Sequence, residues 1–271
     1  MIYAFQMMAQ IDYTLFTVQI QMGGDVMNAT IQQLVKHVSV REFKNERLSD
    51  ETKQHLLTAA RSASSSHFVQ SFSILEITDE KLRKELAEIT NSASYVNQTG
   101  TFYVFIGDLY RQSKLLLENN RTLDGLRNME SLLVSVIDAT IAAQNMVIAA
   151  ESLDLGICYI GGIRNDIEKV AELLNLPPFT IPVFGLTVGV PEYKNQVKPR
   201  LLLENQVGEN QYPHEQFTDL KAYEELTKDY YALREKNQHQ TSWGNKNVEF
   251  FEEIRRPEIA GFLKKQGFTL D

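Results

Sequence analysis

The sequence has a single cysteine, Cys158, and no excess of basic residues. One cysteine cannot form a disulfide within the chain, which is typical of a protein of a reducing compartment such as the cytoplasm. Acidic residues outnumber basic ones, 35 to 27, and the net charge over 271 residues is −8. Nucleic-acid binding needs a basic surface, so we expect no nucleic-acid partner. Cys158 lies in an apolar segment, where we expect it to pack in the core.

The familiar catalytic motifs are also absent. The sequence contains no G-x-S-x-G, H-E-x-x-H, C-x-x-C or Walker A motif, and its five histidines lack the spacing of metal ligands, so no metal site is expected. G-x-G-x-x-G is missing as well, which argues against a Rossmann dinucleotide site. No nucleophile–base pair stands out, so the chemistry must be sought in another kind of site.

Residues 1–26 lack Lys and Arg and have no small-residue cleavage site before Met27, so they do not match a secretory signal. A helix start follows Met27, with Asn28 or Thr30 as its cap. We therefore expect residues 1–26 to be a non-native or over-called extension that is dispensable. Residues 27–271 are expected to form a single domain with an extended C-terminal arm. The alternative is that residues 1–26 are an additional segment that packs on the body.

The central part of the sequence, residues 128–165, begins with a long and almost entirely apolar helical segment. A helix that is apolar on every side is a buried helix. Its length would also suit a membrane span, but Asp138, Gln144 and Asn145 lie in its middle. An aspartate there costs roughly 2.5–3.5 kcal/mol on insertion scales. We therefore expect a buried central helix and no membrane association.

Helical and strand patterns alternate along the chain, with helices dominating. Strands are expected at 72–77, 102–106, 157–160 and 181–190. Helices besides the central one are expected at 30–37, 49–60, 82–89, 109–117, 166–174, 219–234 and 248–265. This pattern predicts an α+β fold, in which helices surround a small mixed β-sheet and cover a long buried central helix. The C-terminal helices have little core of their own, which favours contact with a partner subunit.

Four short segments combine hydroxyls, backbone amides and cations that suit a phosphate. They are His37-x-Ser39-x-Arg41, Ser64–Ser66, Gly161-Gly162-x-Arg164 and Lys198-Pro199-Arg200. A strand that ends in a glycine pair before a helix often holds a phosphate-bearing ligand. Each segment also has a simpler interpretation: a capping box from Ser39 to Glu42, a helix-exit loop, a tight turn with positive φ, and surface charge.

Taken in order, these segments resemble the nitroreductase family of flavin enzymes, specifically its branch of NADPH-dependent, oxygen-insensitive nitroreductases and flavin reductases. The resemblance covers nearly all of residues 28–271. It is carried by residues 37–41, 60–66, 142–145, 159–165, 182–185, 198–200, 230–234 and 242–243.

The resemblance implies a nitroreductase-like fold and a homodimer with FMN at the subunit interface. NADPH would reduce the flavin at N5 and leave, and a small-molecule acceptor would then take two electrons in a ping-pong reaction. Nitroaromatics, quinones and free flavins are the implied acceptors, and no protein side chain is catalytic, since a flavin carries the hydride chemistry. The alternatives are a dedicated NADPH:FMN reductase, a disulfide reductase, and a non-catalytic FMN-binding protein.

The resemblance also assigns residues. Arg41, Lys198 and Arg200 would hold the FMN phosphate, with His37 and Ser39 beside them. The isoalloxazine would be lined by Ser64, Ser65, Ser66, Tyr159, Ile160, Gly161, Gly162 and Arg164.

Arg234 matches the position implied in binding the 2′-phosphate of NADPH, with Lys236 or Lys246 as possible additional cations. Alternatively, Arg234 only complements the C-terminal dipole of its helix. Two positions depart from the family pattern: Val38 replaces an arginine of the first motif, and Ala93 replaces a glutamine that hydrogen-bonds the flavin in many members. One cation and one ring contact are therefore missing.

Overall fold

The computed structural model describes residues 27–271, so the predicted extension at residues 1–26 lies outside the described residues. Contacts divide the chain into two compact units, 1–37 and 38–271. In the first unit, helix α2 spans Ala29–Val35. Asn28 Oδ1 accepts a hydrogen bond from the backbone N–H of Ile31 at 3.0 Å. Asn28 is therefore the cap of this helix.

A four-stranded sheet forms the centre of the second unit, with the strand order β2-β3-β5-β4. The strands are β2 (Phe72–Glu76), β3 (Thr101–Asp108), β4 (Gly156–Ile160) and β5 (Thr180–Gly189). All three ladders of this sheet are antiparallel. A parallel bridge joins Ser39 to Ile157 at its β4 edge. A smaller antiparallel sheet pairs β1 (Glu42–Phe43) with β6 (Pro191–Tyr193).

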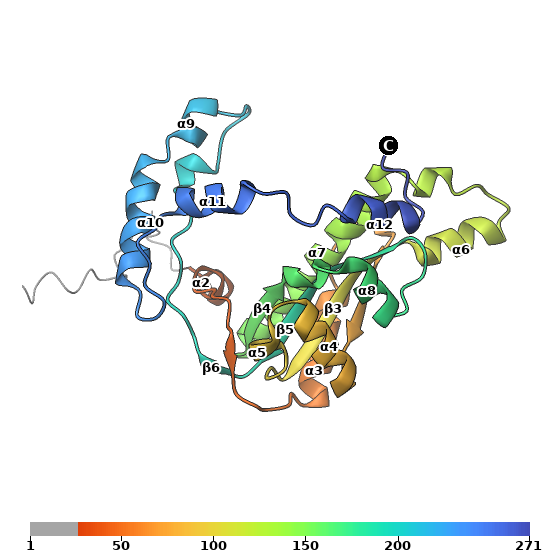
Figure 1. Ribbon diagram of the computed structural model, residues 1–271, viewed down its shortest axis with the longest axis horizontal. Helices are drawn as coiled ribbons and strands as arrows, with labels where there is room; N and C mark the ends of the chain where they lie inside the picture. Colours follow the sequence, from red (N-terminus) through yellow and green to blue (C-terminus); the bar gives the residue numbers. More distant parts are fainter. Residues whose placement is uncertain (1–26) are drawn as a thin grey trace, which may run out of the picture. The chain divides into compact units, whose positions relative to one another are not determined.

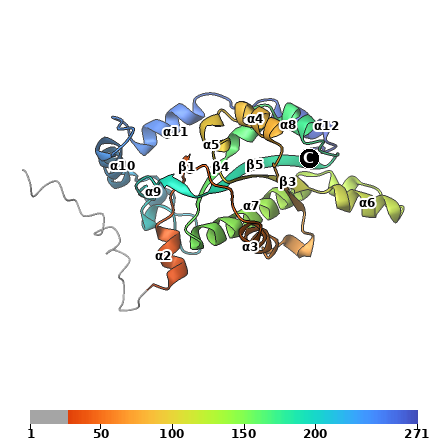
Figure 2. The same ribbon diagram turned by 90° about the horizontal axis from the view of Figure 1, so that it is seen from below.

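Helices cover both faces of the four-stranded sheet (Figures 1 and 2). One face carries α3 (Asp50–Arg61) and α7 (Met129–Ser152), and the other carries α4 (Glu80–Ile89), α5 (Ala93–Val96) and α8 (Ile167–Leu173). Strand β3 shows why, because successive side chains of a strand point to opposite faces. Its Tyr103 and Phe105 join the core beneath α3 and α7, while Phe102, Val104 and Ile106 join the core beneath α4 and α5. The predicted α+β fold is confirmed.

The other helices are α6 (Tyr110–Glu118), α9 (His214–Thr218), α10 (Lys221–Leu233), α11 (Trp243–Phe251) and α12 (Ile259–Lys265). Short 3₁₀ turns are η1 (Ser66–Phe68), η2 (Asp124–Leu126), η3 (Gly161–Arg164) and η4 (Leu203–Asn205). The helix predicted over 248–265 is wrong as one element, because the chain leaves helical geometry between α11 and α12. Arg256 has a φ of 54° and precedes Pro257. A proline lacks a backbone donor and disfavours helical geometry in the preceding residue.

Helix α7 is the long central helix that the sequence predicts, and Asn128 caps it. It packs against the sheet through one face, and the single chain leaves part of its other side uncovered. Leu133, Ile137 and Ile141 remain exposed. Their spacing of four residues places them along one stripe. Helix α7 is long and apolar enough to cross a membrane, yet the face opposite this stripe is core and includes the buried Asp138.

Candidate functional site

The glycine pair follows directly on the end of β4 and opens the turn η3. Neither glycine has a positive φ, so the interpretation as a positive-φ turn is wrong. Gly162 is required for close packing, because a Cβ there would collide with the backbone carbonyl of Thr90. A Cβ at Gly161 would meet only the Arg164 guanidinium, at 3.6 Å. The backbone at Gly161 is therefore accessible to a flat ligand.

Arg164 stands apart from the other predicted cations. Its Nη1 donates to the backbone carbonyl of Val183 on β5. Burial, with a smaller contribution from Arg256, lowers the pKa of Arg164. The guanidinium thus fixes η3 on the sheet, and its charge is directed into the protein.

Tyr159 and Ile160 lie on opposite faces of β4. The Tyr159 ring packs edge-on against Phe184, with centroids 5.1 Å apart, and its hydroxyl donates to Gln144 Oε1 at 3.3 Å. Burial, assisted by the charge of Glu151, raises the pKa of Tyr159 to about 12. Ile160 is buried in the opposite core with Cys158. Tyr159 is therefore a neutral side chain held between β5 and α7 at physiological pH.

The serine cluster begins a loop between α3 and β2 that is bonded to Asp138 of α7. Ser65 Oγ donates to Asp138 Oδ2 at 2.7 Å, and the Ser66 N–H donates to Oδ1 at 3.2 Å. The loop then adopts left-handed backbone conformations, which cost roughly 1–3 kcal/mol each in a residue other than glycine. They occur at His67 (φ 45°), Phe68 (φ 58°) and Gln70 (φ 49°). Ser64–Ser66 therefore begin a loop that is strained and hydrogen-bonded to α7, which is more than the simpler interpretation as a helix-exit loop predicts.

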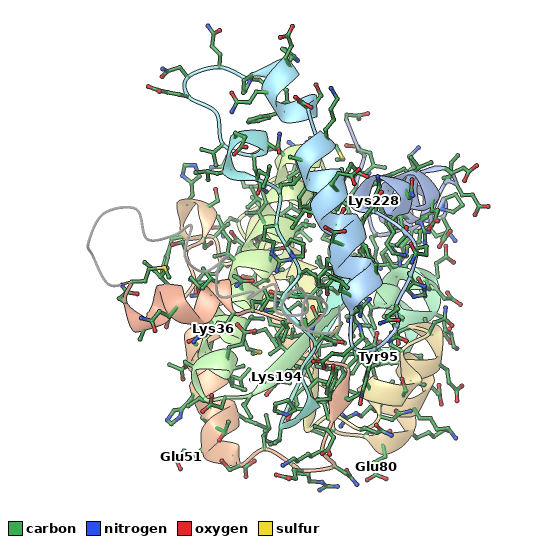
Figure 3. The ribbon with its side chains drawn as sticks, turned by 90° about the vertical axis from the view of Figure 1, so that its left-hand side faces the viewer. Lys36, Glu51, Glu80, Tyr95, Lys194 and Lys228 are labelled. Carbon is green, nitrogen blue, oxygen red and sulfur yellow. The ribbon has the colours of Figure 1, made fainter. Side chains whose placement is uncertain are left out.

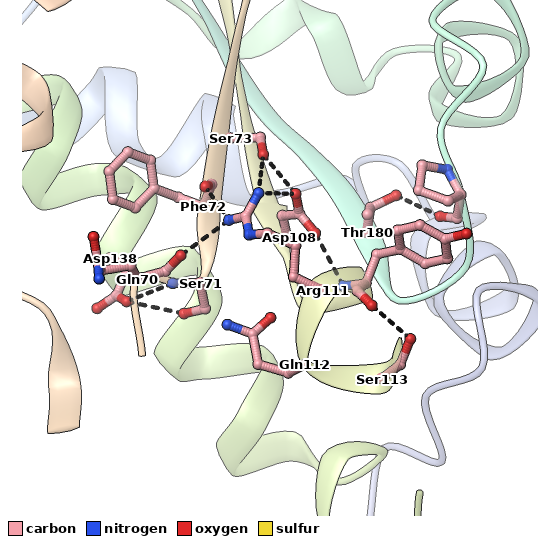
Figure 4. Close-up of polar contacts among 12 residues, drawn as sticks. Gln70, Ser71, Phe72, Ser73, Asp108, Arg111, Gln112, Ser113, Asp138 and Thr180 are labelled. Atoms are coloured by element: carbon pink, nitrogen blue, oxygen red, sulfur yellow. Dashed lines mark hydrogen bonds and ion pairs between the residues drawn. The ribbon is translucent and has the colours of Figure 1, made fainter. Parts of the chain in front are cut away.

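Helix α6 bonds to the same loop from the other side. Arg111 Nη2 donates to the carbonyls of Gln70 and Phe72, at 3.0 and 2.7 Å, and Gln112 Nε2 donates to the carbonyl of Val69 at 2.7 Å. Asp108 Oδ2 accepts from Arg111 Nη1 at 3.0 Å and so orients the guanidinium (Figure 4).

A group of cations gathers where the chain leaves β6. Lys198 is at its centre: burial is the largest cause of its lowered pKa, and the charges of Arg41, Arg234, Arg200 and Lys246 add to the shift. The contribution of four cations to this shift, beside that of burial, shows that Lys198 lies in a positive field, which favours an anion. The structure therefore brings three predicted phosphate ligands together with the predicted coenzyme residue.

Lys198 and Arg200 also line a pocket of about 320 Å³ between this segment and helices α10 and α11. Its remaining lining residues are Pro199, Leu201, Gln206, Tyr223, Thr227, Tyr230, Tyr231 and Trp243. The Tyr223 hydroxyl donates to the Pro199 carbonyl at 3.0 Å and fixes the position of the segment. Lys228 projects from another part of α10 and pairs with Glu225 (Figure 3). Residues 198–200 therefore form one wall of a pocket, and the simpler interpretation of this segment as surface charge does not describe it fully.

Ser39 joins β4 through its bridge to Ile157, and the Val40 N–H donates to the Ile157 carbonyl at 2.8 Å. Glu42 belongs to β1, so the interpretation of residues 39–42 as a helix-capping box is wrong. His37 lies in the first compact unit, and its place beside the phosphate ligands stays a prediction.

Two lysines follow α10, and the sequence could not tell which of them belongs to the cationic group. The structure gives them different partners. Lys236 Nζ lies 3.1 Å from Glu42 Oε2 and 3.8 Å from the centroid of the Tyr193 ring. Lys246 instead lies over the Tyr231 ring at 5.6 Å and acts on Lys198. Lys246, with Arg234, belongs to the cationic group, whereas the charge of Lys236 is compensated by Glu42.

Sequence reasoning missed the part that Asp138 plays. The available signal was an ionisable residue in the middle of an apolar helix, which is uncommon unless the group is paired. Its partners are 67 to 73 residues away in the sequence, so their identity required the fold.

Known proteins are similar to this chain over most of its length. The sequence model described as "Nitroreductase family" matches residues 34–190, and that of the family's C-terminal domain matches residues 198–271. The chain is 38% identical over 249 residues to the FMN reductase (NADPH) of Bacillus subtilis, covering 90% of this chain and 99% of that protein. It is 40% identical over 243 residues to the oxygen-insensitive NADPH nitroreductase of Salmonella typhimurium, with the same coverage of 90% and 99%.

Solved structures show the same similarity. Nitroreductase A from Vibrio parahaemolyticus is 34% identical, with a TM-score of 0.83 over 91% of this chain and 100% of that chain. The NADPH:FMN oxidoreductase from Vibrio harveyi, solved with NAD+, is also 34% identical, with a TM-score of 0.80 over 89% of this chain and 99% of that chain.

Proposed function

Because the chain belongs to the nitroreductase family, we propose that it is an NADPH-dependent, FMN-containing oxidoreductase. It takes a hydride from NADPH and passes two electrons to a second small molecule in a ping-pong reaction. Nitroaromatics, quinones and free flavins are the acceptor class. The observation that carries the proposal is the convergence of Arg41, Arg200, Arg234 and Lys246 on Lys198.

The described residues fit FMN. A phosphate dianion needs several cations, and bidentate arginine suits it best. Arg41, Lys198 and Arg200 are assigned to this phosphate. The accessible backbone at Gly161 leaves room for a flat ring next to the end of β4. The tethered loop that contains Ser65 and Ser66 is assigned to the other contacts of the ring.

The flavin, when bound, supplies the hydride chemistry, and the protein's contribution is binding and orientation. Tyr159 keeps its proton because of its raised pKa, so it packs as a neutral side chain between Phe184 and Gln144. Arg164 holds the glycine turn against β5 and keeps the Gly161 backbone in place. Arg234 and Lys246 are assigned to the coenzyme, whose 2′-phosphate distinguishes NADPH from NADH.

The purified protein is expected to be yellow and to lose its visible flavin absorbance when NADPH is added without oxygen. The colour should return when a nitroaromatic, a quinone or free FMN is supplied, and comparing these acceptors would distinguish a broad reductase from a dedicated FMN reductase. A protein that takes up no FMN at micromolar concentration would contradict the proposal. A yellow protein that NADPH does not bleach would instead be a non-catalytic flavin-binding protein.

The proposal includes a homodimer, which is supported by the exposed stripe on α7. Ile137 is 52% exposed and lies between Leu133 and Ile141, which are also exposed. Large apolar side chains in a continuous stripe are typical of an interaction surface. A second copy of this chain would cover the stripe in a symmetric contact. We place the dimer in the cytoplasm, where the single cysteine stays reduced.

Replacing Ile137 with arginine is expected to convert the dimer to monomers, since it buries a charge in an apolar contact. Sedimentation velocity would measure the change. The matched control is Leu117→Arg on α6, a leucine with a similar exposure of 54% that lies outside the stripe. We expect this control to remain dimeric. A dimeric Ile137→Arg protein would contradict the assignment of this face.

A further inference from the structure

Asp138 is a buried carboxylate whose hydrogen bonds all reach one loop. It lies in the middle of α7 with 1% of its surface exposed. Oδ2 accepts from Ser65 Oγ at 2.7 Å, from the Ser71 N–H at 3.0 Å and from Ser71 Oγ at 2.9 Å. Oδ1 accepts from the Ser66 N–H at 3.2 Å. The two oxygens therefore bind both ends of the segment from Ser65 to Ser71, and Figure 4 shows the end at Ser71.

The segment between these two ends is strained. His67, Phe68 and Gln70 have positive φ, a conformation that persists in such residues only when the surroundings hold it. Ser65 Oγ also accepts from the Gln70 N–H at 2.7 Å, so the Asp138 hydrogen bond orients a hydroxyl that closes the loop on itself. Phe68, at the tip, is 80% exposed. A loop held this firmly, with a large apolar ring directed to solvent, is typical of a ligand-binding segment.

Arg111 and Gln112 hold the same loop through the carbonyls of Val69 and Gln70. Donors of Ser65, Ser66 and Ser71 thus bond to α7, whereas two carbonyls of the loop accept from α6. Helices α6 and α7 hold different residues of the loop. Only the hydrogen bonds to Asp138 on α7 include Ser65 and Ser66. These are residues that the proposed function assigns to the flavin.

We infer that Asp138 is a positioning residue of the flavin site. It holds residues 65–71 in their strained conformation, so that Ser65, Ser66 and Phe68 face the isoalloxazine before the cofactor binds. The inference rests on the proposed function. Asp138 itself is buried behind the loop and acts only through it.

Asp138→Asn is the most direct test, because asparagine has nearly the same shape. Its single carbonyl oxygen can occupy the place of Oδ1 or Oδ2 but not both. Either the Ser66 N–H or the Ser71 N–H then faces an amide NH₂ group, which cannot accept from it. Ser71→Ala is the milder variant, since it removes one hydroxyl that is not assigned to the flavin. Its matched control is Ser135→Ala on α7, a buried serine whose hydroxyl donates to Leu132 of its own helix.

We expect FMN affinity, measured by fluorescence titration of the flavin-free protein, to fall roughly tenfold in Asp138→Asn, as when a buried hydrogen bond is lost. The visible circular dichroism of bound FMN should change in Asp138→Asn and in Ser71→Ala. Amide hydrogen exchange of residues 66–71 in the flavin-free proteins should become faster in both variants, and more so in Asp138→Asn than in Ser71→Ala. Ser135→Ala should change none of the three.

If Asp138→Asn does not fold, Ser71→Ala and its control decide the matter. Unchanged FMN affinity, dichroism and loop exchange in Ser71→Ala would overturn the inference. So would an Asp138→Asn protein that only melts earlier and binds FMN as the wild type does. A wild-type protein that binds no FMN would overturn the proposed function and this inference with it. Wild-type FMN binding with unaltered variants overturns the inference alone.

Discussion

Replacing Lys198 with methionine is expected to weaken FMN binding and, at the same time, to stabilise the flavin-free protein. A charge-assisted hydrogen bond contributes roughly 1.5–3 kcal/mol, so its loss should raise the dissociation constant by about one to two decades. The flavin-free protein should become more stable because the variant removes a charge that is buried and that four nearby cations repel. FMN titration and thermal melting of the flavin-free protein would measure the two effects.

The sign of the pH dependence follows from the lowered pKa of Lys198. The unfolded chain, with the ordinary lysine pKa of 10.5, binds more protons than the folded protein above the lowered value. Stability therefore rises with pH in this range, because the unfavourable charge is progressively lost. This rise should be smaller in Lys198→Met. Inorganic phosphate should raise the melting temperature of the wild-type flavin-free protein more than that of the variant.

The control is Lys264→Met, at an exposed lysine on α12, the helix that packs against α8. It should leave both FMN affinity and the melting temperature of the flavin-free protein nearly unchanged. Lys198→Arg should retain most of the affinity, since it keeps the charge. Wild-type FMN affinity in Lys198→Met would show that Lys198 does not contact the phosphate.

Arg234→Ala is expected to lower kcat/KM with NADPH by about one to two decades, at roughly 1.5–3 kcal/mol for a charged hydrogen bond. NADH lacks the 2′-phosphate, so kcat/KM with NADH should change little. Arg234 ends α10, where its guanidinium lies 5.8 Å from the centroid of the Tyr230 ring and close enough to Lys198 to affect its pKa. Its position in the cationic group favours a binding role over simple compensation of the helix dipole, which contributes about 0.3–1 kcal/mol.

The two nearby lysines make this test sharper. Lys246→Ala should also reduce the preference for NADPH, since Lys246 belongs to the same cationic group. Lys236→Ala is the matched control, because Glu42 and Tyr193 already engage its ammonium. Equal losses with both coenzymes in Arg234→Ala, or no loss at all, would leave Arg234 as a helix-end charge.

The sequence predicted local features well, because their causes lie within a few residues. Helices were expected to begin at Ser49 and Asn128, and each of these residues accepts a hydrogen bond from the N–H three residues ahead. The interruption near Pro257 was missed because the apolar pattern continued across it. Local cues thus located most elements within one or two residues.

Contacts between distant segments were predicted less completely. The grouping of Arg41, Lys198 and Arg200 followed from the family resemblance, since nothing in their separation along the chain brings them together. Arg164 was placed with the ring-lining residues on the same basis, and its bond to the Val183 carbonyl could be found only in the structure. Asp138 was an argument against a membrane span, and its role as acceptor for a loop 70 residues away depends on how α7 lies against β2.

Cys158 has a practical consequence for studying this protein in solution. It is buried in the core beside Ile160, and burial raises the pKa of its thiol despite the opposing charge of Arg41. Thiolates, rather than thiols, react with alkylating reagents, so the native cysteine is protected while the protein stays folded. A cysteine introduced at Val248, which is 68% exposed on α11, would then be the sole site of attachment for a spin label or fluorophore. Pairs of such labels could report the distance between the C-terminal arms of two copies without altering the native sequence elsewhere.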